Sequence, residues 1–254
     1  MSLIQEFSTA ISQHGKAFSF IRKNGLSWTF LIPIAIFLIL ATIGFYSMGE
    51  LAELLADKFV TDYIFITTLL VFFLKILFFV ILGKWGGYLV VIIMSPFLAY
   101  ISEKTEKIIT GNDYPFNFSQ FLSDVIRGIL LALRNFCIET LIGIVLYIFS
   151  FFTVGIAVPI VSIFLVLVSA YFYGFSFIDY TNERRKLSVS ESVRYVRQRK
   201  AMSCGHGIVF ALLIYIPIIG VALSAFYSII ATVAATQHVL EDESRGKNQF
   251  SELL

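Results

Sequence analysis

The chain has 254 residues, of which 58% are hydrophobic and only 14% are charged, and its formal net charge is +2. A soluble domain usually carries about 25% charged residues, so this composition excludes an ordinary soluble protein and predicts an integral membrane protein. The three histidines and two cysteines are scattered, and the sequence has no HExxH, GxSxG or phosphate-binding loop motif. We therefore expect no enzyme, no metal, no cofactor and no nucleic-acid partner.

The first 23 residues predict an amphipathic helix. Five apolar side chains recur at helical spacing in this stretch: Leu3, Phe7, Ile11, Phe18 and Ile21. Glutamines, a glutamate and a lysine occupy other positions, which favours a helix lying in the membrane interface. A short helix in solution is the alternative. No cleavable signal peptide is expected, because the first long apolar run begins only after Gly25.

Residues 24–110 predict two long helices. The uncharged run from 24 to 49 reaches about 39 Å as a helix, enough to cross a hydrocarbon core of about 30 Å, and we expect a transmembrane helix over 28–48. A second apolar run extends from Tyr63 to Met94. The "SPF" at 95–97 is expected to bend or end it, and a charged amphipathic helix is expected to follow, ending near Gly111.

Lys75 interrupts the second apolar run. A charge at the centre of a membrane helix costs about 2.5–3.5 kcal/mol unless the side chain reaches water or a partner. Lys75 therefore either faces a water-filled anion path or lies near the outer end of a long tilted helix.

Two further apolar segments predict helical hairpins over 120–178 and 201–240. Their uncharged parts, 140–178 and 201–240, carry "TVGIAVPI" and "IYIPIIGV" at their centres. Glycine and proline favour a turn there, and a turn that emerged into water would normally be polar. We therefore predict hairpins that turn inside the membrane, at Val154–Pro159 and Ile216–Gly220. Two ordinary crossings per segment are the alternative. Because backbone at such a turn must be shielded from lipid, we also expect a homo-oligomer.

Positive charge gathers in a segment over 179–200, which separates the hairpins, and a polar tail over 241–254 follows the second hairpin. Ser188 and Glu191 form a capping box that starts a helix near Val189. Asp179 and Glu183 lie close enough in sequence to pair locally with Arg184 and Arg185. The positive-inside tendency predicts cytoplasmic termini and a cytoplasmic basic segment. This segment either touches anionic lipid or lines the mouth of an anion path, through Arg184, Arg185, Arg194 and Arg197.

The order of several stretches resembles the CysZ and etoposide-induced protein family. These stretches are "NGLSWTFLIPIAI", "SPFLAYISEKTEKIITG", "DYTNERRKLSVSESVRYVRQRKAMSCGHG", "YIPIIGV" and "ATVAATQHVLE". The resemblance spans about 20–240. It implies an all-α integral membrane protein with two long transmembrane helices and two hemi-penetrating hairpins, assembled as an oligomer. It also implies sulfate uptake for cysteine synthesis across a bacterial inner membrane.

The resemblance implies an anion site at the turn before the first long helix, where the family has Gly-Leu-Arg. Here Gly25, Leu26 and Ser27 occupy those positions, so the charge-assisted bond of the usual arginine is missing. Ser27 can still donate a hydrogen bond, the helix N-terminus offers N–H groups, and Arg22 and Lys23 offer charge. Ser27 as a simple N-cap is the alternative.

Two functions therefore stand at this point. The first is channel-like or gradient-driven transport of an inorganic anion, with sulfate as the expected substrate. The second is a non-transporting membrane scaffold or lipid-interacting protein. An anion bound at the turn over 24–28 would favour the first, and lipid filling a central path would favour the second.

Overall fold

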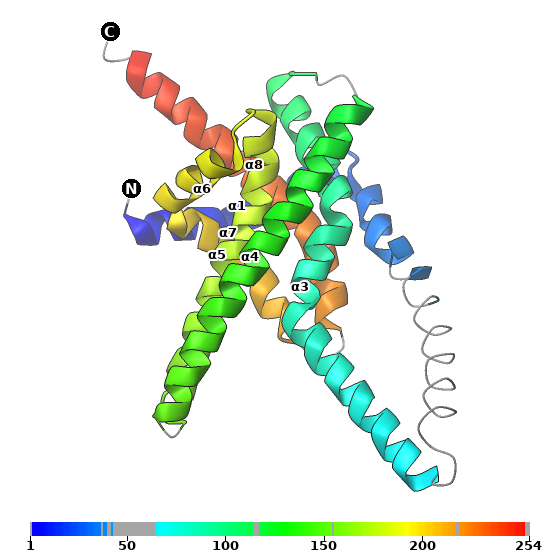
Figure 1. Ribbon diagram of the computed structural model, residues 1–254. Coiled ribbons are helices and arrows are strands. Elements are labelled where there is room, and N and C mark those ends of the chain that lie inside the picture. Colours follow the sequence, from blue (N-terminus) through cyan, green and yellow to red (C-terminus); the bar gives the residue numbers. More distant parts are fainter. Residues whose placement is uncertain are drawn as a thin grey trace.

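The computed structural model describes residues 2–36, 38–39, 42, 64–113, 117–153, 155–216 and 219–251, and within α3 and α8 the side chains of 64–67, 70–71, 74–85 and 246–251 fall outside this description. Every regular element in the described ranges is helical, as Figure 1 shows. The elements are α1 (Leu3–Lys23), η1 (Ser27–Phe30), α3 (Ile64–Thr110), α4 (Phe118–Phe152), α5 (Val158–Arg184), α6 (Val189–Gln198), α7 (Lys200–Ile214) and α8 (Gly220–Ser251).

Four helical stretches in the described ranges are long and apolar enough to cross a membrane. They are Gly86–Thr110, Phe118–Phe152, Val158–Arg184 and Gly220–Arg245. The protein is therefore an all-α, multi-pass membrane protein, as the composition predicted. The helix expected over 28–48 is helical from Ser27 to Ile36, while 37, 40–41 and 43–48 lie outside the described residues.

Helix α3 does not end at the expected "SPF". It continues through Pro96 as one helix of 47 residues and ends at Thr110, before Gly111 with φ 77°. A proline removes one backbone hydrogen bond, and membrane helices tolerate this loss where a neighbouring helix packs against the site. Such packing is present here, because a Cβ on Gly128 of α4 would lie 2.5 Å from Ser95 Oγ. The prediction of a helix end at 95–97 was therefore wrong, and the predicted end near Gly111 is confirmed.

Each segment predicted as a hairpin folds as a helix–turn–helix unit, which a hairpin turning inside the membrane and two ordinary crossings would both give. Helices α4 and α5 are joined at 153–157, and α7 and α8 are joined at 215–219, with Val154, Pro217 and Ile218 outside the described residues. The first turn needs Gly155, whose φ is 79° and whose N–H donates to the Ser150 carbonyl at 3.1 Å. Helix α7 has only 15 residues, about 22 Å, so it is shorter than the hydrocarbon core.

Helices α5 and α7 pack through glycines that bring their backbones into contact. A Cβ on Gly174 would lie 1.8 Å from the Ser203 carbonyl oxygen, and one on Gly207 would lie 1.9 Å from the Ala170 carbonyl oxygen. Small residues of this kind permit close helix approach where there is no hydrophobic driving force between helices. This contact places α7 against α5 and so fixes the second hairpin beside the first.

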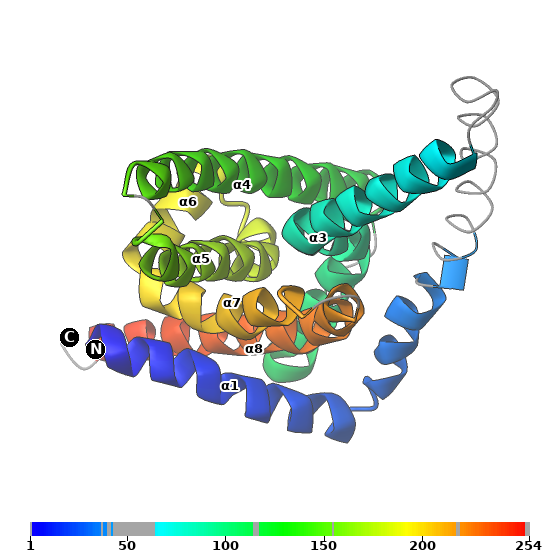
Figure 2. The ribbon, with the colours of Figure 1, turned by 90° about the horizontal axis from the view of Figure 1, so that it is seen from below.

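Helix α1 lies across α7 and α8, as Figure 2 shows. Its protein-facing side buries Ala10, Gln13, His14, Ala17 and Ile21. Four of its apolar side chains point away from the protein: Leu3, Ile4, Ile11 and Phe18. The predicted apolar stripe is thus divided, since Ile21 packs inward. The outward apolar face is the one available to a membrane interface.

A buried hydrogen-bonded chain helps to hold α1 in place. His14 Nε2 lies 3.3 Å from Nδ1 of His206 on α7, whose Nε2 lies 3.0 Å from Nδ1 of His238 on α8. Tyr227 bonds to the other ring nitrogen of His14. Burial and the nearby His238 lower the pKa of His14 to about 4, so this imidazole is neutral at pH 7. Among the described residues, no group of three histidines, cysteines or carboxylates is placed to hold a metal ion.

The glycine contact between α5 and α7 gives a direct test of this packing. Gly174→Ala should lower the unfolding temperature in detergent, because its Cβ forces the two backbones apart, and overpacking of this kind costs about 1–3 kcal/mol or more. Gly15→Ala on α1 is the matched control, since nothing lies within 4 Å of its added Cβ. It should stabilise by about 0.5–1 kcal/mol. Equal unfolding temperatures for both variants would contradict the close α5–α7 contact.

Candidate functional site

The predicted anion-binding turn follows directly after α1. The Asn24 N–H donates to the Phe20 carbonyl at 3.0 Å, and the Leu26 N–H reaches back to the Ile21 carbonyl at 3.0 Å. Between them Gly25 has φ 70°, a conformation that glycine adopts at little cost where a helix ends. Gly25 therefore reverses the chain, and the next helix starts beside the end of α1.

The helix start presents free donors at this turn. Leu26 occupies the N-cap position of η1 without a side-chain cap, so the alternative that made Ser27 the N-cap was wrong. Ser27 is the first helical residue and is exposed. The N–H groups of Ser27 and Trp28 precede the first intrahelical bond, which Thr29 makes to the Leu26 carbonyl at 3.0 Å. A helix start of this kind can accept an anion.

Two cations flank the turn. Arg22 and Lys23 form the last turn of α1 and are exposed. In the part of the chain that the structure describes, neither has a carboxylate within 4.0 Å. Local chain geometry thus brings Arg22, Lys23, Gly25 and Ser27 together, while Leu26 is buried beneath them.

The predicted basic mouth divides into two classes of arginine. Arg184 donates to Glu106 at 2.8 Å, to Ser102 Oγ at 2.9 Å and to the Tyr180 carbonyl at 2.8 Å. Arg185 donates to Glu243 at 2.7 Å and to the Thr181 carbonyl at 2.9 Å. The charges of both arginines are therefore compensated by carboxylates of α3 and α8. They tie the C-terminal end of α5 to its neighbours.

Arg194 and Arg197 form the second class. They are exposed on α6, and within the described ranges no carboxylate lies within 4.0 Å of either guanidinium. The predicted capping box is confirmed, since the Ser188 N–H donates to Glu191 at 2.8 Å and the Glu191 N–H donates to Ser188 Oγ at 3.3 Å. The capping bonds to Ser188 lower the pKa of Glu191, which keeps its carboxylate charged and acceptor-only.

The structure does not bring α6 and the turn over 24–28 together. They lie at opposite ends of α1 in both Figure 1 and Figure 2. Arg194 and Arg197 are therefore separate from the anion-binding turn, and any influence they have on it is a long-range potential. Lys75 lies in α3, in the stretch whose side chains are outside the described part, so its role stays a prediction.

A buried ionic network occupies the region where the sequence predicted only local pairing. Arg127 on α4 holds Asp179 on α5 with two bonds, at 3.0 and 3.2 Å, and also contacts the Leu187 carbonyl. Ser192 on α6 donates to the same carboxylate. Glu183 lies 3.7 Å from Arg127. The expected pairing of Asp179 and Glu183 with Arg184 and Arg185 was therefore wrong, because partners from other helices are closer.

Three hydroxyl groups extend the contact between Arg184 and Glu106 into the core, since Arg184 also donates to Ser102. Ser102, Thr181 and Thr236 come from α3, α5 and α8, and each is fully buried. Ser102 lies 2.7 Å from Thr236, and Thr181 lies 3.3 Å from Thr236. Hydroxyl groups can both donate and accept, so they pass hydrogen bonds between helices without a net charge.

Glu139 is a candidate functional residue for which the sequence suggested only a structural pairing with Arg134. It lies in the second half of α4, on the candidate spanning stretch, and accepts hydrogen bonds from Tyr88 and Ser169, both at 2.6 Å. An ionisable carboxyl group within a membrane-spanning helix carries a high free-energy cost, so its presence there makes it a candidate for a functional role. The available signal was its position at the start of a 39-residue uncharged run.

Comparisons with known proteins give a consistent result. A family model described as "Sulfate transporter CysZ/Etoposide-induced protein 2.4" matches residues 14–224. A protein from Pseudomonas fluorescens strain Pf0-1 called "Sulfate transporter CysZ" is 27% identical over 207 residues, covering 78% of this chain and 81% of the relative. Proteins of the same name from strains Pf-5 and SBW25 are 28% and 29% identical over 136 residues, or 52% of this chain and 53% and 52% of theirs.

The ionic network makes a prediction about stability. Arg127→Gln should lower the free energy of unfolding by about 3–5 kcal/mol, because it leaves Asp179, whose side chain is 5% exposed, without its bidentate partner. Arg197→Gln on exposed α6 should change it by less than about 0.5 kcal/mol. Thermal unfolding in one detergent measures both. Arg127→Leu combined with Asp179→Leu should recover much of the loss, whereas no recovery would argue against the pair.

Proposed function

Since the chain belongs to the family of the sulfate transporter CysZ and the etoposide-induced protein 2.4, we propose that it transports an inorganic anion across a membrane, with sulfate as the main substrate. The family match over residues 14–224 carries this proposal. It includes the turn over 24–28 and three of the four candidate spanning helices. The relatives that are called sulfate transporters support the choice of substrate.

The anion is taken up first at the turn after α1. Ser27 and Trp28 offer backbone N–H groups, Ser27 adds a hydroxyl donor, and Arg22 and Lys23 add positive charge. A tetrahedral dianion has acceptors on all sides, so it can use several of these donors at once. We assign Arg184 and Arg185 to holding the helix ends together, because carboxylates already satisfy them. Arg194 and Arg197 raise the local anion concentration at the same membrane face.

Transport is channel-like or gradient-driven, with Lys75 proposed to face the path. Moving one charge against 100 mV costs about 2.3 kcal/mol, so a dianion entering a cell that is negative inside by 100 mV costs about 4.6 kcal/mol. Uptake therefore needs either a steep inward sulfate gradient, maintained by consumption in cysteine synthesis, or a coupled ion. We propose no enzymatic role for this chain.

The protein is proposed to reside in a bacterial inner membrane, with both termini and the basic segment in the cytoplasm and with several subunits in an assembly. The helical hairpins are proposed to turn inside the membrane. Their tips support this: Phe151 and Ile156 are 80% and 83% exposed in the isolated chain, and Ile219 is also exposed. Large apolar side chains at a turn fit hydrocarbon or a neighbouring subunit rather than water. The short α7 supports it further, because α7 cannot reach across.

Sulfate uptake into proteoliposomes tests the transport function. The wild-type chain should take up labelled sulfate, and Ser27→Ala should weaken apparent affinity about fivefold by removing one donor worth about 1 kcal/mol. Ser27→Arg should strengthen it about tenfold, since a charge-assisted bond is worth more. Ser19→Arg, at an exposed position in α1, adds the same charge away from the turn and should have little effect. Absence of uptake in every variant would favour the scaffold function.

Cysteine labelling tests the hairpin tips. In a background with Cys137 and Cys204 replaced by serine, Ile156→Cys and Ile219→Cys should resist a membrane-impermeant maleimide applied to intact cells. These positions avoid Gly155, which has a positive φ, and Gly220, where a Cβ would lie 2.2 Å from the Leu213 carbonyl oxygen. Ser188→Cys is the positive control: at its predicted cytoplasmic position it should react with a membrane-permeant maleimide and not with the impermeant one. Rapid labelling of either tip from outside would show an ordinary crossing.

A further inference from the structure

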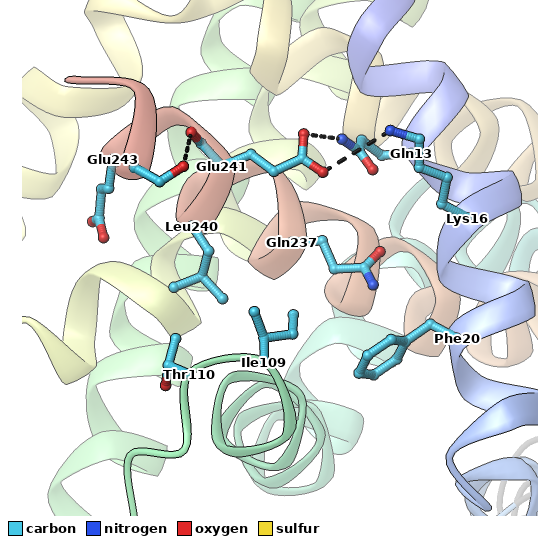
Figure 3. Close-up of a pocket in the computed structure, with 10 residues that line it drawn as sticks. Gln13, Lys16, Phe20, Ile109, Thr110, Gln237, Leu240, Glu241 and Glu243 are labelled. Atoms are coloured by element: carbon cyan, nitrogen blue, oxygen red, sulfur yellow. Dashed lines mark hydrogen bonds and ion pairs between the residues drawn. The ribbon is translucent and has the colours of Figure 1, made fainter. Parts of the chain in front are cut away.

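A cleft of about 490 Å³ opens between α1, the end of α3 and α8, away from the anion-binding turn. Figure 3 shows this pocket, with Gln13 and Lys16 of α1 on one side and Gln237 and Glu241 of α8 on the other. Phe20 and Ile109 form its apolar part. Nothing in the transport proposal uses this pocket.

Two buried amide oxygens beside the pocket have no hydrogen-bond donor among the described residues. Gln13 is 0% exposed and donates its Nε2 to Glu241 at 2.7 Å, which leaves its Oε1 buried with no partner among the described residues. The Oε1 of Gln237 is buried and unpartnered in the same way. In Figure 3 the side chains of Gln13, Gln237 and Glu241 are directed toward the same part of the pocket. A buried amide oxygen without a donor is costly, so these atoms indicate a ligand that donates.

The ligand should also carry positive charge. Glu241 contributes a carboxylate that accepts one short bond, from Gln13 at 2.7 Å, and forms two long ion pairs, with Lys16 Nζ at 3.9 Å and Arg245 at 4.0 Å. Both of these side chains are more than half exposed, and exposed pairs of this length contribute little. One carboxylate and two amide oxygens match a primary ammonium group, which has three N–H donors.

The position of the pocket further restricts the chemical class of the ligand. Its apolar wall includes Ile109 of α3, which is 45% exposed. Helix α1 forms the other wall, and its opposite, outward face presents Ile11 and Phe18, the face available to lipid. Lys16, at the rim, supplies a charge that a phosphate can use. We propose that the pocket binds the headgroup of an ethanolamine-type phospholipid, with Gln13, Gln237 and Glu241 accepting the ammonium N–H groups and Lys16 facing the phosphate.

Lipid binding to the delipidated, purified chain tests this proposal. Native mass spectrometry and thermal unfolding should show phosphatidylethanolamine binding about tenfold tighter than phosphatidylcholine, whose trimethylated nitrogen keeps the charge but has no N–H donors. Phosphatidylglycerol, which lacks the amine, should bind no better than phosphatidylcholine. Equal binding of all three lipids would overturn the proposal, because the ammonium N–H donors would then contribute nothing to the affinity. If free ethanolamine raised the unfolding temperature as much as the phospholipid does, the ligand would be a free amine and the proposal of a lipid would be overturned.

Variants locate the binding in this pocket. Gln237→Leu and Glu241→Gln should each reduce the preference for phosphatidylethanolamine by about tenfold. Gln237→Leu should also raise the unfolding temperature without lipid, since it removes an unpaired buried oxygen. Gln198→Leu, at an exposed position on α6, is the matched control and should leave the preference unchanged. A full preference in Gln237→Leu would overturn the assignment. Neither measurement depends on sulfate transport, so each proposal can fail alone.

Discussion

The requirement that charge inside a membrane protein be paired organises this structure around the C-terminal end of α5. Asp179, Arg184 and Arg185 follow one another within seven residues there, and each takes its partner from a different helix: Arg127 of α4, Glu106 of α3 and Glu243 of α8. A charge left alone in a low-dielectric interior costs several kcal/mol. These pairs therefore specify which helices meet at this end, and the hydroxyl cluster of Ser102, Thr181 and Thr236 continues the same connection into the core.

The opposite end of the bundle follows a different rule. The tips of the hairpins carry no charge, and their apolar side chains face outward. Between the two ends, α5 and α7 meet through close backbone approach at Gly174 and Gly207. A membrane supplies no hydrophobic driving force between helices, so packing of small residues takes over where ionic pairs are absent. The molecule is thus polar and tied together at one end and apolar at the other.

Helix α1 connects the surface features of the protein. Its last turn carries Arg22 and Lys23 beside the anion-binding turn, and its inner face carries His14 and Gln13 into the histidine chain and the headgroup pocket. Its outer face is apolar. One helix therefore ends at the proposed anion-binding turn, packs on α7 and α8 with one face and leaves its other face apolar, which is possible because it lies along the bundle rather than through it (Figure 2).

The sequence by itself determined the features that depend on neighbouring residues. The lack of charge predicted a helical membrane protein, and glycine with proline predicted turns at Val154–Pro159 and Ile216–Gly220, within about two residues of the joins between the helices. The capping box of Ser188 and Glu191 and the reversal at Gly25 followed from local backbone chemistry. The family resemblance placed the anion-binding turn, and it explains why Ser27 rather than an arginine is the point to test.

Only the tertiary structure decided which distant groups meet. Arg127 and Asp179 are 52 residues apart, and His14 and His206 are 192 apart. No local pattern marks such pairs, because any carboxylate nearby in sequence is an equally plausible partner for an arginine. Helix packing likewise decided that α3 continues through Pro96 and that Gln13, polar by type, is fully buried. The energy of a buried charge or amide depends on what surrounds it in space, and that surrounding is set by the fold rather than by the adjacent residues.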